Sequence, residues 1–134
     1  MNITKYIGIP FADHGFDHSG CDCWGLVHLV YREVLGIEMP NLGDRYSDAY
    51  AHGEVHALVG SVADESWNVD VTNAQWKPLD VMVFKRCGVE AHVGLYLRRG
   101  EMLHVVDGMA SAEERYNTAK WGRRLSRVLR HVDA

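Results

Sequence analysis

The chain has 134 residues, which is the usual length of one folded domain. Hydrophobic residues make up 47% and charged residues 24%, so the chain can build a core and is too apolar for a disordered segment. Its formal net charge of -4 gives no basis for sequence-independent binding to phosphates. We therefore expect a single domain, residues 1–134, that does not have nucleic acid as a partner.

No apolar run approaches the roughly 20 residues that a membrane span needs, and the opening MNITKYIGIP lacks the order of a signal peptide. We expect a protein made in the cytoplasm, without a membrane span. The three cysteines include Cys21 and Cys23, which are too close together for an unstrained disulfide. The cysteines are therefore interpreted as thiols.

The first 20 residues contain glycine and proline without a sustained period, which predicts an ordered loop after a short element at residues 3–7. Apolar residues then recur at helical spacing and end before Gly36, which predicts a helix from Cys23 to Leu35. Asp22 is a natural N-cap residue, so it places Cys23 in the first turn.

The segment from 41 to 77 is more polar, and its weak helical pattern predicts a broken helix over 47–64. The region after Pro78 contains short β-prone runs separated by glycines, which predict strands of an antiparallel sheet. A last alternating run, 125–132, fits an edge strand or a short terminal helix, and the strand is favoured. This order predicts an α+β fold, with N-terminal helices packed on a C-terminal antiparallel sheet.

Cys23 has the position of an activated thiol, because a helix N-terminus stabilises the thiolate and lowers the pKa from about 8.5. Acyl transfer also needs a proton acceptor, a partner that orients it, and donors for the oxyanion. His92 and His104, on successive predicted strands, are candidates for the first two roles. Each of the three residues also fits a structural role, as a buried small side chain or a hydrogen-bonded imidazole.

The turn between the two predicted strands decides whether the histidines meet. A two-residue loop, 99–100, would place them on opposite faces of the sheet. A three-residue loop, 98–100, with Gly100 in the left-handed conformation would make them diagonal neighbours on one face. Gly100 favours the longer loop, and we expect the pair on the face that meets the predicted helix, with Val93 and Leu95 on the reverse face.

Four segments of the chain carry a recognisable set of motifs: the approach segment from Gly8 to Gly15, D-C-W-G-L-V at 22–27, L-D-V-M-V-F at 79–84 and H-V-G-L-Y-L at 92–97. Together they resemble the NlpC/P60 family of papain-like cell-wall peptidases, in the branch found in phage tails. His104 falls where the family carries its third catalytic residue. The resemblance covers nearly the whole chain except 41–77.

The resemblance implies a papain-like domain in which Cys23 is the nucleophile, His92 the general base and acid, and His104 its orienting partner. It implies no cofactor and no metal. The implied substrate is an amide bond in peptidoglycan stem peptides, next to D-glutamate, and the implied location is a virion tail that acts at the bacterial cell wall, with other tail-tip proteins as partners. Two alternatives stay open: a structural tail-tip or tail-assembly protein with a vestigial site, and an amidase or acyltransferase with the same Cys-His site.

Three further residues are expected to support this site or contact substrate: Asp22, Phe11 and Trp24. Phe11 stands where the family often has a tyrosine whose hydroxyl assists the oxyanion. Trp24 replaces the serine that usually follows the nucleophile, and Leu79 replaces a common glycine at a strand entrance.

The cluster of His14, His18, Cys21 and Cys23 also suggests zinc, because imidazole and thiolate are preferred zinc ligands. Two ligands separated by one residue are awkward for a tetrahedral site, and no second ligand pair follows. The four tryptophans are interpreted as packing residues rather than a sugar-binding groove.

Overall fold

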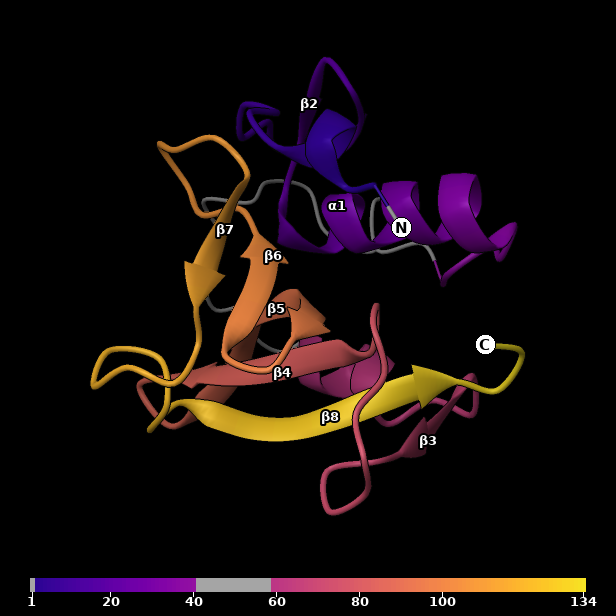
Figure 1. Cartoon of the computed structure of the whole chain (residues 1–134), viewed down its shortest axis with the longest axis vertical. Helices are drawn as coiled ribbons and strands as arrows, with labels where there is room; N and C mark the ends of the chain where they lie inside the picture. Colours follow the sequence, from indigo (N-terminus) through magenta and orange to yellow (C-terminus); the bar gives the residue numbers. More distant parts are fainter. Residues whose placement is uncertain (1, 41–58) are drawn as a thin grey trace.

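A computed structural model describes residues 2–40 and 59–134 and has an α+β architecture (Figure 1). Its main element is a six-stranded antiparallel sheet with the strand order β3-β8-β4-β5-β6-β7. The strands are β3 (Asn68–Asp70), β4 (Val81–Arg86), β5 (Val89–Arg98), β6 (Glu101–His104), β7 (Ala112–Arg115) and β8 (Leu125–His131). The predicted fold class is confirmed.

The predicted helix is present as α1 (Cys23–Val30), which continues as the π-helical turn η2 (Tyr31–Leu35). Asp22 caps it: the backbone of this residue is extended, and its carboxylate accepts a hydrogen bond of 2.7 Å from the Gly25 N–H. Gly36 ends the helix with a φ of 67°, the left-handed conformation that glycine adopts readily. The predicted bounds and N-cap are confirmed.

The segment before α1 folds as the 3-10 helix η1 (Thr4–Tyr6) and a hairpin of β1 (Phe16–Asp17) and β2 (Gly20–Cys21). The start of α1 packs tightly on this hairpin, because a Cβ on Gly25 would lie 1.8 Å from the Gly15 carbonyl oxygen. Only glycine fits at that position of the D-C-W-G motif, and the close approach fixes where the first turn of α1 lies.

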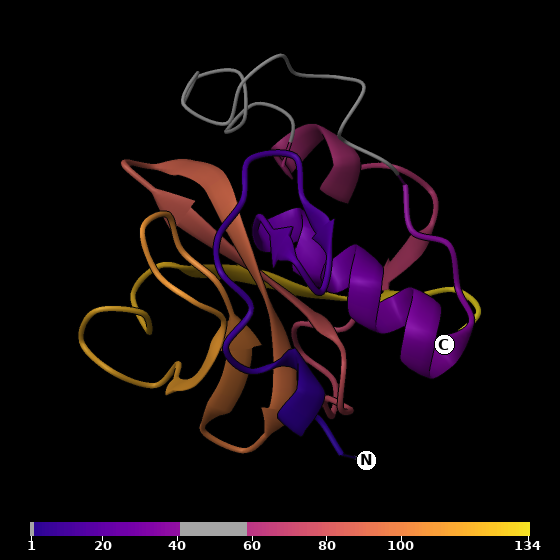
Figure 2. The same ribbon diagram turned by 90° about the horizontal axis from the view of Figure 1, so that it is seen from above.

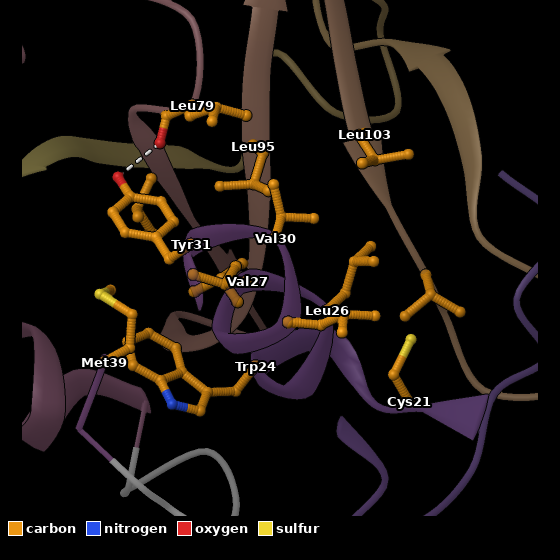
Figure 3. Close-up of a cluster of buried hydrophobic side chains, with 14 of the residues drawn as sticks. Cys21, Trp24, Leu26, Val27, Val30, Tyr31, Met39, Leu79, Leu95 and Leu103 are labelled. Atoms are coloured by element: carbon orange, nitrogen blue, oxygen red, sulfur yellow. Dashed lines mark hydrogen bonds between the residues drawn. The ribbon is translucent and has the colours of Figure 1, made fainter. Parts of the chain in front are cut away.

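Helix α1 covers one face of the sheet (Figures 1 and 2). Figure 3 shows the main core between them, where Val27 and Val30 of the helix pack near Leu95 and Leu103 of the strands. These four side chains are buried, as is Tyr31, whose hydroxyl donates a 2.6 Å hydrogen bond to the Leu79 carbonyl. The prediction that the Cys23 helix packs across the sheet is confirmed.

The opposite face of the sheet carries a second, smaller core. Its central indole, Trp121, comes from the loop between β7 and β8 and packs edge-on against Phe84 at 5.3 Å between ring centroids. The cluster consists of Val71, Met82, Phe84, Met102, Trp121 and Val128. Successive residues of β4 and β5 therefore alternate between two buried faces.

One expectation about the sheet is wrong, and one expectation about a helix falls mostly outside the described residues. Strand β8 is not an edge strand, because β3 pairs with its outer side, and β3 and β7 are the edges. The broken helix predicted over 47–64 falls mostly on residues that are not described, and helix is seen at 59–63. In the described parts of the chain, no helix has the length and apolar character needed to cross a bilayer.

Candidate active site

The first turn of α1 brings Cys23 to strand β5. Its side chain is half-buried against the main core, and the backbone N–H of Val93 interacts with the thiol. Val93 directly follows His92, so the thiol lies beside the backbone next to that histidine.

The thiol of Cys23 is neutral in the unliganded site. Burial and the Asp22 carboxylate raise its pKa to about 12, although the backbone N–H groups of Val93 and Trp24 favour the thiolate. The prediction of a lowered pKa is therefore wrong. The helix position alone favours ionisation, but the cost of desolvating the thiolate outweighs it.

The two predicted histidines contact each other directly. His92 Nε2 lies 2.9 Å from His104 Nδ1, and the ring planes are inclined by 75°. The prediction that the two residues are neighbours on one face of the sheet is confirmed. Their hydrogen bond links β5 to β6 on that face.

The turn that joins these strands differs from the prediction. Arg98 pairs with Glu101, so the turn has two residues and the predicted three-residue loop is wrong. The histidines nevertheless share a face, because the register shifts between Tyr96 and Arg98 and one extra residue on β5 restores the parity. Gly100 has a φ of 89°, which confirms its predicted left-handed conformation.

The histidines occupy the face opposite α1, and this also corrects the prediction. The ring of His92 lies 5.9 Å from Phe84 and 5.2 Å from Trp121, both in the smaller core, whereas Val93 and Leu95 belong to the main core under the helix. Alternation along β5 requires this arrangement, because its apolar residues are the ones that bury α1. Within the described part of the chain, the His92 side chain forms a hydrogen bond with His104 and none with Cys23.

Glu114 and Trp121 extend the histidine pair. The sequence interpretation missed Glu114, and it gave Trp121 a packing role only. His104 Nε2 lies 2.8 Å from Glu114 Oε1, and the indole N–H of Trp121 donates to Glu114 Oε2 at 2.7 Å. Glu114 lies on β7, whose sequence Ala-Glu-Glu-Arg has three charged residues and no alternating apolar pattern. No local signal marks it as a strand, so nothing in the sequence brings Glu114 to His104.

Both histidines are uncharged at neutral pH. Burial, the neighbouring His104, and the cations Arg86 and Arg124 lower the pKa of His92 to about 3. Burial also lowers the pKa of His104, although the hydrogen bond to Glu114 opposes this effect. The candidate site therefore consists of a neutral thiol, next to the backbone of Val93, and a pair of neutral imidazoles.

Two residues expected to support the site have different surroundings. Phe11 is half-buried and donates a backbone hydrogen bond of 2.9 Å to the Met109 carbonyl, and its ring brings no hydroxyl. Trp24 is 5% exposed, and its indole N–H donates to the Pro40 carbonyl at 2.6 Å. Its ring packs edge-on against Trp67. The side chain of Trp24 is thus part of the main core, next to the first turn of α1.

The other cysteines and histidines singled out in the sequence lie apart from this arrangement. Cys21 is buried, which raises its pKa to about 12, and Cys87 is exposed in the turn between β4 and β5. His18 lies 2.8 Å from Glu33 on the surface. Among residues 2–40 and 59–134, no group of three His, Cys, Asp or Glu side chains has the proximity of a metal site.

Leu79 has a backbone conformation that glycine adopts readily. The residue has a φ of 75°, in the left-handed region that disfavours branched side chains, while its side chain is 2% exposed in the main core. Its N–H donates to the Tyr96 carbonyl at 2.7 Å. At the entrance to β4, the positive φ of Leu79 strains the backbone, and the burial of its apolar side chain offsets that cost.

A cysteine in the first turn of a helix, packed against an antiparallel sheet that carries a histidine pair, is the arrangement of papain-like folds. The sequence profile of the NlpC/P60 family matches residues 8–130, and the chain belongs to that family.

The chain is similar to the tail tip assembly protein K of Escherichia phage lambda, with 34% identity over 133 residues that cover 96% of this chain and 63% of that protein. It is also similar to the gamma-DL-glutamyl hydrolase of Bacillus subtilis (strain 168), with 29% identity over 77% of this chain and 21% of the relative. The chain therefore spans less than two thirds of these curated relatives.

Two solved structures share the fold. The NlpC/P60 domain of the peptidoglycan hydrolase SagA has a TM-score of 0.62 at 23% identity and covers 94% of this chain and 90% of that one. An NlpC/P60 family protein from Bacillus cereus ATCC 10987 has a TM-score of 0.69 at 21% identity, and the match covers 95% of this chain and 37% of that one.

Proposed function

We propose that this chain is a cysteine hydrolase that cleaves an amide bond in peptidoglycan stem peptides. Cys23 is the nucleophile, His92 the general base and acid, and His104 its orienting partner. The observation that carries the proposal is the 2.9 Å contact between His92 Nε2 and His104 Nδ1. His92 lies on β5, and the residue that follows it, Val93, contacts the Cys23 thiol through its backbone N–H. Residues 1–134 are proposed to act as one domain of this kind.

The first half of the reaction forms an acyl-enzyme. The Cys23 sulfur attacks the amide carbonyl carbon as His92 takes the thiol proton, so the neutral resting pair becomes charged only when substrate is bound. The backbone N–H of Cys23, at the start of α1, donates to the oxyanion. His92 then gives its proton to the leaving amine as the carbon–nitrogen bond breaks, and a thioester remains.

The second half releases the product. His92 takes a proton from a water molecule as its oxygen attacks the thioester, and the carbon–sulfur bond breaks to give a free carboxyl group. The Cys23 thiol is restored by proton return from His92. Phe11 has no hydroxyl to assist the oxyanion, so backbone donors carry that stabilisation.

The substrate bond and the place of action are proposed from the relatives. The name of the Bacillus subtilis hydrolase supports a bond next to D-glutamate, and the similarity to SagA, a peptidoglycan hydrolase, supports peptidoglycan as the polymer. The similarity to a phage tail tip assembly protein supports a location in a virion tail, with other tail-tip proteins as partners and action at the bacterial cell wall.

A structural role in tail-tip assembly is the second candidate function. The similarity to protein K favours it, because that relative is named for assembly and matches 96% of this chain. The lack of a hydroxyl on Phe11 is compatible with a site that no longer turns over.

Digestion of purified muropeptides separates these functions. The hydrolase should convert a disaccharide tetrapeptide into a disaccharide dipeptide and a free dipeptide, identified by mass, and the folded Cys23→Ala variant should yield neither. Release of the whole stem peptide from the sugar would identify an amidase, and products that carry an added amine would identify an acyltransferase. No product from the native chain, together with incorporation of Cys23→Ala into tails, would identify the structural role.

A further inference from the structure

The carboxylate of Glu114 lies within hydrogen-bond distance of two ring nitrogens at the candidate site. His104 Nε2 lies 2.8 Å from Oε1, and Trp121 Nε1 lies 2.7 Å from Oε2. An indole nitrogen is only a donor, so Oε2 of Glu114 is an acceptor. Burial disfavours the charge, but the hydrogen bonds from His104 and Trp121 hold the pKa of Glu114 below its ordinary value. Both carboxylate oxygens therefore accept.

This acceptor determines where each histidine carries its proton. An ionised Glu114 requires the hydrogen of His104 to be on Nε2, so Nδ1 of the neutral ring has a lone pair. The 2.9 Å contact between the rings then requires a hydrogen on Nε2 of His92. His92 is also neutral, so its Nδ1 has no proton and is the nitrogen that can act as a base.

We propose that Glu114, held in place by Trp121, is a positioning residue that sets the tautomers of His104 and His92 and so leaves Nδ1 of His92 free to take the Cys23 proton. The role in turnover rests on the proposed function, whereas the proton positions stand on the contacts alone.

Trp121 also encloses the histidine pair. Its ring lies 5.2 Å from His92 and 5.0 Å from His104, where it is perpendicular to the His104 ring. The indole is 5% exposed, and Lys120 and Arg124 lie over its ring at 5.3 and 5.6 Å. One side chain thus limits water access to both rings and orients the carboxylate that they depend on.

Replacement of Glu114 by glutamine gives a sharp test, because the amide has nearly the same shape but one oxygen acceptor and one nitrogen donor. The indole N–H of Trp121 requires the oxygen, so the amide N–H group faces His104 Nε2. His104 must then carry its proton on Nδ1 and donate it to His92 Nε2. His92 in turn carries its proton on Nδ1, and the base is lost.

Nitrogen-15 NMR of the histidine rings in the full chain reads these proton positions directly. The native chain should show both rings protonated on Nε2, and Glu114→Gln should show both protonated on Nδ1. Glu113→Gln is the matched control, because Glu113 is the neighbouring residue on β7 and pairs instead with Arg98 at 3.4 Å. That variant should keep the native tautomers.

A double variant tests the part played by the indole. Trp121→Phe keeps an aromatic ring but removes the N–H group, so the amide in Glu114→Gln/Trp121→Phe can turn its oxygen toward His104. The native tautomers should return in this double variant, which a purely structural role of Glu114 does not predict.

Turnover of muropeptides supplies the second measurement. Glu114→Gln should lower kcat roughly 100-fold with little change in KM, and the double variant should recover part of that loss. His92 protonated on Nδ1 in the native chain, or unchanged tautomers in folded Glu114→Gln, would overturn the inference. A third outcome is that the native chain shows the predicted tautomers but hydrolyses no muropeptide. That result would support the assigned proton positions, but it would overturn the proposed function and the role of Glu114 in turnover.

Discussion

His104 packs against the space that Gly94 leaves on the neighbouring strand. A Cβ on Gly94 would lie 3.3 Å from His104 Cβ and 3.3 Å from Met102 Sδ, tighter than an ordinary contact. Gly94 lies two residues after His92 on β5, so a side chain at this position would point to the same face of the sheet as His92. The H-V-G segment therefore supplies one imidazole and also the gap that lets the second reach it.

Gly94→Ala should disturb this pairing without unfolding the chain. The added methyl group pushes His104 away from His92, at a cost of about 1–3 kcal/mol in the free energy of unfolding. We expect a loss of muropeptide turnover larger than the loss of stability explains, with urea unfolding as the stability measurement. Gly60→Ala is the control, because the nearest neighbour of its Cβ would be the Glu90 carboxylate oxygen at 3.6 Å. Equal turnover in the two variants would contradict the proposed role of the gap.

Local sequence signals predicted the helix and the strand that carry the candidate site. The N-cap Asp22, the stop at Gly36 and the alternation along β5 all depend on short-range preferences, and all three hold. The pairing of His92 with His104 was also predicted, although through the wrong turn. The register shift after Tyr96 that makes a two-residue turn compatible with the pair has no sequence signature.

The features that the sequence missed depend on tertiary structure. Glu114 lies on a polar edge strand, and Trp121 lies in a loop, so only the folded sheet brings them to His104. The sign of the pKa shift on Cys23 was wrong for the same kind of reason. A helix N-terminus is visible in the sequence, but the burial that opposes its effect is a property of the packed molecule.

Alkylation of Cys23 should require alkaline pH. A pKa of about 12 leaves little thiolate at neutral pH, so the rate of reaction with iodoacetamide should rise about tenfold per pH unit from 7 to 10. Peptide mapping by mass spectrometry separates the label on Cys23 from that on Cys21 and Cys87. A rate that is already constant below pH 7 would instead indicate a thiolate–imidazolium pair in the resting site.

Two substitutions of Asp22 separate its charge from its cap. Asp22→Asn keeps a side-chain oxygen for the Gly25 N–H but removes the negative charge beside Cys23, so it should preserve stability and speed alkylation at a given pH. Asp22→Ala removes both and should cost about 1 kcal/mol of stability as well. Slower alkylation in Asp22→Asn would contradict the electrostatic effect assigned to this carboxylate.

The two histidines should differ in what their loss does to turnover. His92 transfers the proton at each step, so His92→Ala should lower kcat by roughly 1,000-fold or more. His104 orients its partner, and the side-chain oxygen of asparagine can still accept from His92 Nε2–H, so His104→Asn should retain part of the activity. Circular dichroism and urea unfolding check that both variants fold. Equal and complete loss in two folded variants would count against separate roles.

Lowering the pH should already reduce the free energy of unfolding near pH 6, above the range in which carboxylates titrate. An unfolded chain binds protons on its imidazoles below about pH 6.5, whereas the pKa of His92 is about 3 in the fold and that of His104 is also lowered. The unfolded state therefore binds more protons between these values, and the free energy of unfolding falls as pH falls. From pH 6.5 to pH 5, His92 alone contributes a loss of about 2 kcal/mol.

Urea unfolding at a series of pH values measures this effect, and His92→Asn isolates the contribution of one ring. The variant should be less stable than the native chain at pH 7.5, because His104 loses its partner, but its stability should fall less between pH 6.5 and pH 5. The pKa of Glu114 is lowered, so this carboxylate adds to the acid loss only below that range. A native chain whose free energy of unfolding stays constant from pH 7 to pH 5 would show that its imidazoles are not held neutral by the fold.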